Sequence, residues 1–228
     1  MMPYWLHILA IVSLSLGFIS AAAITLDILR GRRQTMAVMN FVWPITGLYF
    51  GPLALWAYWR LRRMGSGPVF HHHSDGRRSG RPFWQSVFIG STHCGAGCVL
   101  GDIVGEWIVF ATGFLVAGSR LLADYTLDFV LAYLVGIAFQ YFAIVPMRRL
   151  PPAQGIVEAI KADTLSLIAF EVGMFGWMAV SAKLLFHPPL RPDSAAYWLM
   201  IQVGMIIGFA TTFPANWFLI RRGIKTPM

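Results

Sequence analysis

Six apolar runs, each long enough to cross a bilayer, alternate with short polar segments along the chain. They cover residues 6–29, 36–59, 83–117, 126–145, 162–186 and 197–220. A helix needs about 20 predominantly apolar residues to span the hydrocarbon core. The pattern therefore predicts an all-α fold, a polytopic membrane helix bundle of about six transmembrane helices that forms a single integral membrane domain over residues 1–228.

The first run is expected to be a spanning helix and not a secretion signal. Residues 20–23, Ser-Ala-Ala-Ala, resemble a cleavage site, but no Lys or Arg precedes the run. The run is also longer than the apolar part of a signal peptide, which has about 7–15 residues.

Residues 60–82 are rich in Gly, Ser and Arg, which predicts a flexible cytoplasmic loop. The loop contains the triplet His71, His72 and His73. Ordinary loop polarity is favoured for this triplet over a metal-gathering tract.

Composition supports a membrane protein. Hydrophobic residues make up 57% of the 228 residues and charged residues only 12%, where a soluble domain has about 25%; the mean hydropathy is +0.63. The formal net charge is +8. Most Arg and Lys residues lie between apolar runs, as anchors against lipid headgroups do, so the expected partner is the lipid bilayer and not nucleic acid.

The distribution of Lys and Arg predicts the orientation. With six spans, twelve of them lie on the side of the loop 60–82 and six on the other side. Positive residues are enriched in cytoplasmic loops, so both termini are predicted to be cytoplasmic. The cluster Arg30, Arg32 and Arg33 opposes this assignment.

The third run is unusually polar for a membrane helix. It contains His93, Cys94, Cys98, Asp102 and Glu106, with the two cysteines and the two carboxyls at intervals of four residues. Such groups are costly in hydrocarbon, about 2.5–3.5 kcal/mol for a charge at the bilayer centre. This stripe therefore indicates a site facing protein.

Spacing also suggests what surrounds this stripe. Gly97, Gly101 and Gly105 form a smooth stripe that lets another helix approach closely.

The spacing of the two cysteines does not favour a disulfide. Side chains at i and i+4 have Cβ atoms about 5–6 Å apart, whereas a disulfide needs about 3.8 Å. Chelation of one metal ion by Cys94 and Cys98 fits better, and packing of the cysteines as small buried hydrophobes is the alternative. His93 either completes the metal ligands or binds a neighbouring helix.

Two further runs add polar and sulfur-containing side chains. Glu171 lies near the expected midplane, on one helical face with Asp163, Met174 and Met178. The last run adds Met205. Thioethers and thiolates suit Cu(I), and gap-filling is the alternative for each Met.

The last run also carries Met200, Gln202 and Asn216. Asp27 and Asp128 are expected near Asp102 and Glu106, either as an acidic vestibule or as ordinary interfacial polarity.

Three segments carry a resemblance to a known family: residues 91–107 (STHCGAGCVLGDIVGEW), 162–178 (ADTLSLIAFEVGMFGWM) and 202–225 (QVGMIIGFATTFPANWFLIRRGIK). They resemble bacterial multi-pass membrane proteins catalogued as a domain of unknown function, some of which are loosely labelled copper oxidase. The resemblance implies a multi-helix fold in the bacterial cytoplasmic (inner) membrane.

Three functions remain open from the sequence. In the first, His93, Cys94, Cys98, Met174, Met178 and Met205 bind or transport a soft metal ion, with Cu(I) favoured. In the second, the chain is a membrane redox enzyme or an accessory subunit of a cofactor-bearing complex. In the third, Asp102, Glu106 and Glu171 form a proton or cation pathway and the cysteines only pack. Further membrane subunits or a second copy of the chain are partners that the sequence leaves open.

Overall fold

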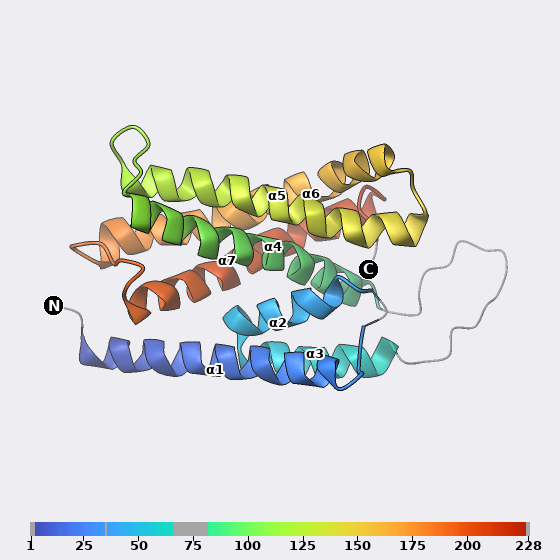
Figure 1. The fold of residues 1–228 in the computed structure, drawn as a ribbon, viewed down its shortest axis with the longest axis horizontal. Coiled ribbons are helices and arrows are strands. Elements are labelled where there is room, and N and C mark those ends of the chain that lie inside the picture. Colours follow the sequence, from blue (N-terminus) through green and yellow to red (C-terminus); the bar gives the residue numbers. More distant parts are fainter. Residues whose placement is uncertain (1–2, 35, 66–81, 227–228) are drawn as a thin grey trace.

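The computed structural model describes residues 3–34, 36–65 and 82–226, and these are helical throughout apart from short connections (Figure 1). The helices are α1 (Tyr4–Leu29), α2 (Met39–Phe50), α3 (Pro52–Gly65), α4 (Phe83–Thr112), α5 (Arg120–Arg148), α6 (Pro152–Val180), the π-helical turn η1 (Ser181–Leu185) and α7 (Ala195–Arg221). Within the described residues no strand is formed beyond one isolated bridge. The predicted all-α bundle is confirmed.

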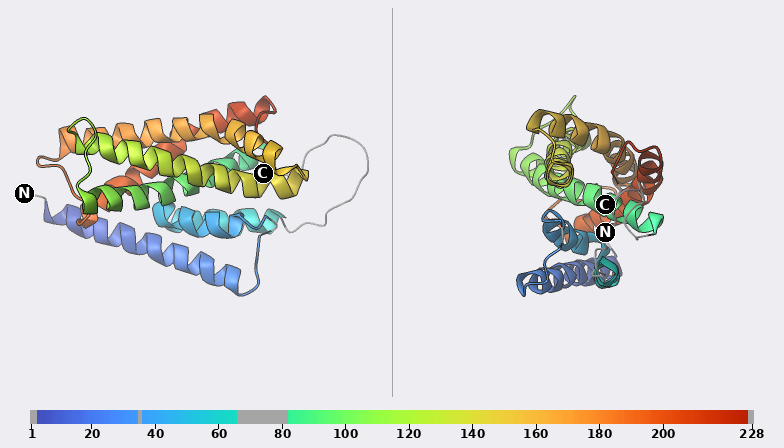
Figure 2. Two further views of the ribbon diagram at one scale, coloured as in Figure 1. Left: turned by 45° about the horizontal axis from the view of Figure 1, so that its top comes forward. Right: turned by 90° about the vertical axis from the view of Figure 1, so that its right-hand side faces the viewer.

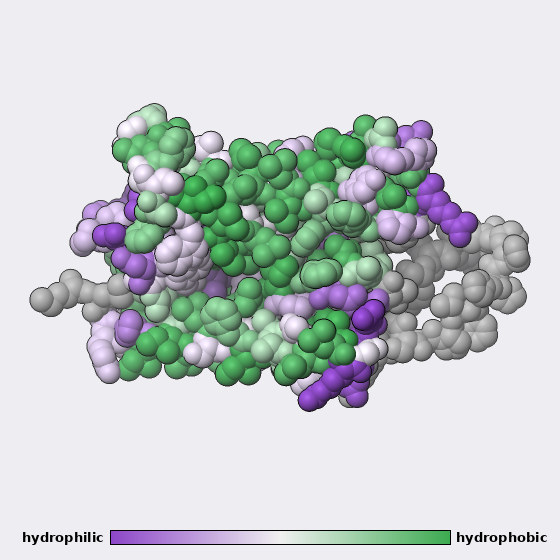
Figure 3. Space-filling model, in the orientation of Figure 1, coloured by the Kyte–Doolittle hydropathy of each residue, from purple (hydrophilic) through white to green (hydrophobic). Residues whose placement is uncertain are grey.

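Five helical segments of the described chain are long and apolar enough to cross a membrane: α1, α4, α5, α6 with η1, and α7. On the face shown in Figure 3, apolar side chains cover the middle of the molecule, and hydrophilic ones gather towards its two ends. This surface fits a multi-pass protein embedded in lipid.

The predicted second span, residues 36–59, is wrong as a single crossing. The chain breaks at Gly51 and returns, so α2 and α3 form a helical hairpin with both arms in the same half of the bundle (Figure 1). Gly51 has φ 54°, a backbone conformation that favours glycine, and Pro52 then starts α3 with its fixed φ. Arms of 12 and 14 residues measure only about 18 and 21 Å.

The hairpin changes the topology. Helix α1 begins at one end of the bundle and α7 finishes at the other (Figures 1 and 2). We call the end where α3 finishes and α4 begins the hairpin end, and the end with segment 113–119 the loop end. Both termini were expected on one side of the membrane because six crossings are an even number. Five crossing helices instead place the two ends of the described chain at opposite ends of the bundle.

Helix α4 packs closely against α5 through its glycine stripe, as predicted. A Cβ atom on Gly97 would lie 3.1 Å from Gly136 Cα, and one on Gly101 would collide with the backbone of Ala132. Close approach of helix backbones maximises dispersion contacts where lipid offers no hydrophobic driving force. This contact holds α4 in the interior, so its polar side chains are shielded from lipid.

The hairpin is anchored to α1 and α7. A Cβ atom on Gly47 of α2 would lie 2.9 Å from Ala21 Cα of α1. From α7, Gln202 Nε2 donates to the carbonyl oxygen of Leu48 over 2.6 Å, and Ser13 donates to Gln202 Oε1 over 2.8 Å. The tip of the hairpin is therefore tied to two full-length helices inside the membrane.

Candidate functional site

The polar stripe of α4 is buried, as predicted. His93, Cys98 and Asp102 are fully buried, Cys94 is 1% exposed and Glu106 is 2% exposed. These side chains meet carboxyl groups from α5 and α6 along the interior of the bundle. We call this set the carboxyl row: Asp124, Asp128, Glu106, Asp102, Glu171 and Asp163.

Four members of the carboxyl row lie towards the loop end. Asp102 is close enough to Asp128 and Glu106 for their charges to interact, and Glu106 interacts with Asp124. Glu106 also shares a hydrogen bond with Tyr197 of α7. The row therefore starts at the first turns of α5.

Asp124 was missed from the sequence. It precedes the expected start of its span at residue 126, although its spacing of four from Asp128 was a usable signal. Asp124 forms a long ion pair with Arg120, with Nε–Oδ2 at 3.9 Å.

Of the two aspartates expected near Asp102 and Glu106, Asp128 lies there and Asp27 does not. Asp128 lies with Asp102 and Glu106, and its carboxyl rests against Gly105, where a Cβ atom would collide with it. Asp27 lies at the hairpin end of α1 and is paired with Arg32 at 2.8 Å and with the Tyr58 hydroxyl at 2.9 Å. The direction of α1 in the folded bundle separates Asp27 from the others.

Glu171 of α6 connects the loop-end carboxyls to the cysteines. Its charge interacts with Asp102 and Asp128, and its carboxyl lies beside the thiol of Cys98. Cys98 in turn contacts Cys94. Neither oxygen of Glu171 has a hydrogen-bonding partner of ordinary geometry. Thiols from α4 and a carboxyl from α6 thus converge in one lipid-shielded region.

The hairpin contributes to this central region through Tyr49. The hydroxyl of Tyr49 lies against Gly95, where a Cβ atom would be 2.7 Å from its oxygen, and it interacts with both cysteines. Sequence reasoning placed this residue in a continuous span and did not include it among the candidates. The end of α2 therefore lies at the depth of the cysteines.

The row continues to the hairpin end through Asp163, which lies beside Cys94 and interacts with Lys225. The carboxyl of Asp163 rests against Gly136 of α5, where a Cβ atom would collide with it. Lys225 follows α7 and is fully buried. Its ammonium donates to Asn216 Oδ1 over 2.8 Å and to Ser166 Oγ over 3.2 Å. Lys225 was not a candidate from the sequence, since it lies outside every apolar run.

The predicted metal ligands are only partly brought together. Cys94 and Cys98 share one buried cluster with Met174, Met178 and Met205. His93 instead packs edge-on against Phe139 of α5, with ring centroids 5.9 Å apart.

Over residues 3–34, 36–65 and 82–226, no group of three or more His, Cys, Asp and Glu side chains is arranged to hold a metal ion. The triplet His71, His72 and His73 lies outside the described residues.

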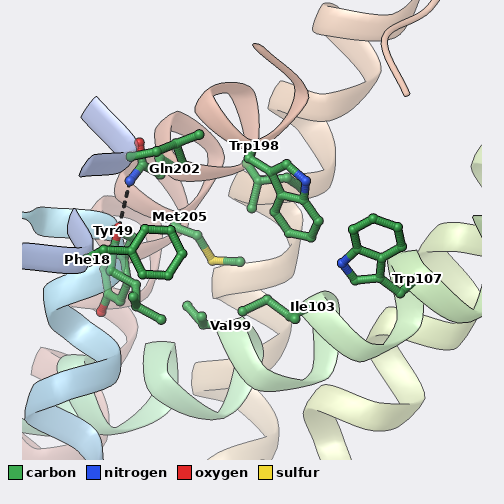
Figure 4. A pocket seen from close by; sticks show the side chains of 11 residues that line it. Phe18, Tyr49, Val99, Ile103, Trp107, Trp198, Gln202 and Met205 are labelled. Atoms are coloured by element: carbon green, nitrogen blue, oxygen red, sulfur yellow. Dashed lines mark hydrogen bonds between the residues drawn. The ribbon is translucent and has the colours of Figure 1, made fainter. Parts of the chain in front are cut away.

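An apolar cavity of about 320 Å³ lies on the loop-end side of the hairpin tip (Figure 4). It is lined by Leu14, Phe18, Leu48, Tyr49, Val99, Ile103, Trp107, Trp198, Ile201, Gln202 and Met205. The lining side chains come from α1, the end of α2, α4 and α7. The side chain of Tyr49 adjoins both the cavity and the cysteines.

Comparison with known proteins gives a family and no function. A family model described as a domain of unknown function (DUF4396) matches residues 83–225. The match covers α4 to α7 and ends at Lys225, so it contains all six members of the carboxyl row. No curated protein and no solved structure matches the chain.

Proposed function

The chain belongs to the DUF4396 family, and we propose that it moves protons or small cations across the membrane along the carboxyl row. The observation that carries the proposal is the row itself, six buried carboxyls from three helices. Five of them interact with one another, from Asp124 to Glu171. The thiols of Cys98 and Cys94 lie between Glu171 and the sixth, Asp163. Ionisable groups at membrane depth are expensive and typically mark ion or proton pathways.

The order of the groups along the bundle supports a pathway. Asp124 and Asp128 lie in the first nine residues of α5, at the loop end, and Asp163 lies on α6 nearer the hairpin end. Asp102 and Glu171 fill the interval between them. Neither carboxyl has a hydrogen-bonding partner of ordinary geometry, so both are available to exchange a proton or coordinate a cation.

The half-membrane hairpin also supports transport. Broken helices and re-entrant segments are tolerated at membrane depth only where protein or a water-filled cavity surrounds them, and transporters place such helix ends at their substrate sites. Here the hairpin brings Tyr49 against Gly95, between the two cysteines of α4.

Flux through reconstituted protein tests the proposal. Purified protein in liposomes containing a pH-sensitive dye is driven by a potassium diffusion potential, and parallel samples follow Na⁺ and K⁺ entry. Wild type should conduct at least one of these ions above protein-free liposomes. Asp102→Asn and Glu171→Gln should each lower the flux about tenfold or more, and Asp193→Asn, which changes a carboxyl with 54% side-chain exposure, should not. Absence of wild-type flux for all three ions would overturn the proposal.

The distribution of positive charge supports one orientation. Among described residues, the hairpin end carries Arg30, Arg32, Arg33, Arg60, Arg62, Arg63, Arg148, Arg149, Lys161, Arg221, Arg222 and Lys225, and the loop end carries Arg120, Lys183 and Arg191. We assign the hairpin end to the cytoplasm of a bacterial inner membrane. The Arg30, Arg32 and Arg33 cluster, which opposed a six-span topology, agrees with this one because α2 does not cross.

Reporter fusions test this orientation. Alkaline phosphatase, which is active only outside the cytoplasm, should be active when fused after residue 115 and inactive when fused after residue 150. The reverse activities would contradict the assignment.

A soft-metal site is the second candidate, with Cu(I) as the favoured ion. The observation in its favour is that Cys94 and Cys98 contact each other within the cluster containing Met174, Met178 and Met205. Thiolates and thioethers together suit Cu(I). Titration with Cu(I) against a competing chelator should show binding that Cys94→Ser/Cys98→Ser removes. Equal binding by both proteins would dismiss this candidate.

A further inference from the structure

Lys225 is an unusual residue to find in the interior. Lysine is almost never fully buried unless it is paired, yet Lys225 has no exposed surface. Its ammonium donates to Asn216 Oδ1 and Ser166 Oγ and interacts electrostatically with Asp163. These are three oxygen-bearing side chains from two helices of the bundle.

The backbone directs Lys225 inwards. Helix α7 ends at Arg221, and Gly223 has φ 72°, which reverses the chain. The amides of Ile224 and Lys225 both donate to the carbonyl oxygen of Leu219, over 3.0 and 3.2 Å. The side chain then passes Gly90 of α4, where a Cβ atom would lie 3.9 Å from Lys225 Cε.

The oxygen ligands around the ammonium are organised by one another. Ser166 Oγ donates to Asn216 Oδ1 over 2.7 Å, and Asn216 Nδ2 donates to Ser91 Oγ over 3.0 Å. These bonds orient the amide so that its oxygen points at the ammonium. Asp163 is fully buried, and neither of its oxygens has a hydrogen-bonding partner of ordinary geometry, which leaves the carboxyl available for a positive charge.

We infer that Asp163, Ser166 and Asn216 form a monovalent-cation site at the hairpin end of the carboxyl row, and that Lys225 occupies it as a tethered cation. An ammonium is a compact point charge, and carbonyl, hydroxyl and carboxylate oxygens are the ligands of hard cations. Withdrawal of segment 222–226 frees the site for an ion and opens the row to the cytoplasmic side. This inference rests on the proposed function for its role, but the site itself can be measured without transport.

Cation binding by Lys225→Met protein tests the site. Methionine is an unbranched side chain one heavy atom shorter than lysine, and it carries no charge. The variant in detergent is titrated with NaCl and with KCl, with choline chloride as the ionic-strength control, and its melting temperature and calorimetric heat are recorded. We expect Na⁺ or K⁺ to stabilise the variant and to bind it about tenfold or more tightly than wild type.

Two further variants make the result decisive. Arg222→Met changes an exposed cation in the same segment and should behave as wild type. Lys225→Met/Asp163→Asn should lose the binding gained by Lys225→Met. If Lys225→Met does not fold, Lys225→Gln replaces it, because a neutral polar group can still hydrogen-bond to Asn216 and Ser166.

Binding and flux distinguish this inference from the proposed function. A folded Lys225→Met or Lys225→Gln protein that binds neither Na⁺ nor K⁺ overturns the cation site, even if wild type conducts protons. Binding by the variant with no flux in any protein would support the site and overturn the pathway. Higher flux in Lys225→Met than in wild type would support the closing role of Lys225, and unchanged flux would overturn it.

Discussion

Gln202 of α7 donates a hydrogen bond from Nε2 to the carbonyl oxygen of Leu48, over 2.6 Å, where α2 ends inside the membrane. The last carbonyls of a helix have no partner within the helix, and lipid cannot supply one. This bond therefore allows the hairpin to turn back at Gly51.

Replacing Gln202 with leucine should destabilise the hairpin. The substitution leaves the Leu48 carbonyl without this donor, which costs about 1–3 kcal/mol, and removes the acceptor of Ser13. A lower melting temperature in detergent is expected. Gln154→Leu, on the exposed start of α6, is the control and should melt as wild type does; equal melting of Gln202→Leu would contradict the role of this bond.

Adding one methyl group where α4 contacts α5 should destabilise the protein. A Cβ atom on Gly101 collides with the backbone of Ala132, whereas one on Gly176 meets nothing within 4 Å. Gly101→Ala should therefore lose stability or fail to purify as a folded protein. Gly176→Ala should be neutral or stabilising by up to about 1 kcal/mol, because alanine favours helix. Similar melting of the two variants would show that the helices can move apart without cost.

The cysteines are predicted to be inaccessible and dispensable for ion flux. Both are at most 1% exposed, so a membrane-permeable maleimide should label them only after unfolding. In the pathway function they pack between carboxyls, and Cys94→Ala/Cys98→Ala should conduct within about twofold of wild type if its fold is kept. Loss of flux with an unchanged melting temperature would favour the soft-metal candidate.

Two aspartates that resemble each other in sequence should behave differently. Asp128→Asn alters a member of the carboxyl row and should lower flux, because its charge interacts with Glu106, Asp124 and Glu171. Asp27→Asn alters a carboxyl paired with Arg32 and Tyr58 at the opposite end of the bundle and should leave flux unchanged. A loss of flux in Asp27→Asn but not in Asp128→Asn would contradict this pathway and indicate one along α1.

The carboxyl row was only partly visible in the sequence. The four-residue spacing of Cys94, Cys98, Asp102 and Glu106 predicted a buried stripe on α4, since such groups cannot face lipid. The placement of Glu171 at the depth of the cysteines also agrees with the structure. One end of the row, Asp163, was a candidate from the sequence, but the other was not, because Asp124 lies before its apolar run. Lys225 was missed as well, since it contacts Ser166 across 59 positions.

Hydropathy was sufficient for the all-α bundle, for the existence of its five long helices and for the burial of the stripe, because each follows from the cost of placing polar groups in hydrocarbon. The boundaries were less accurate, since α6 begins at Pro152 and its predicted run began at residue 162. Hydropathy could not predict the course of residues 36–59. A hairpin of two half-length helices has the same composition as one helix that crosses the membrane. The chain reverses at Gly51 because α1, α4 and α7 surround the tip of the hairpin. The course of the hairpin, and with it the side on which Arg30, Arg32 and Arg33 lie, was decided by contacts between helices distant in the chain.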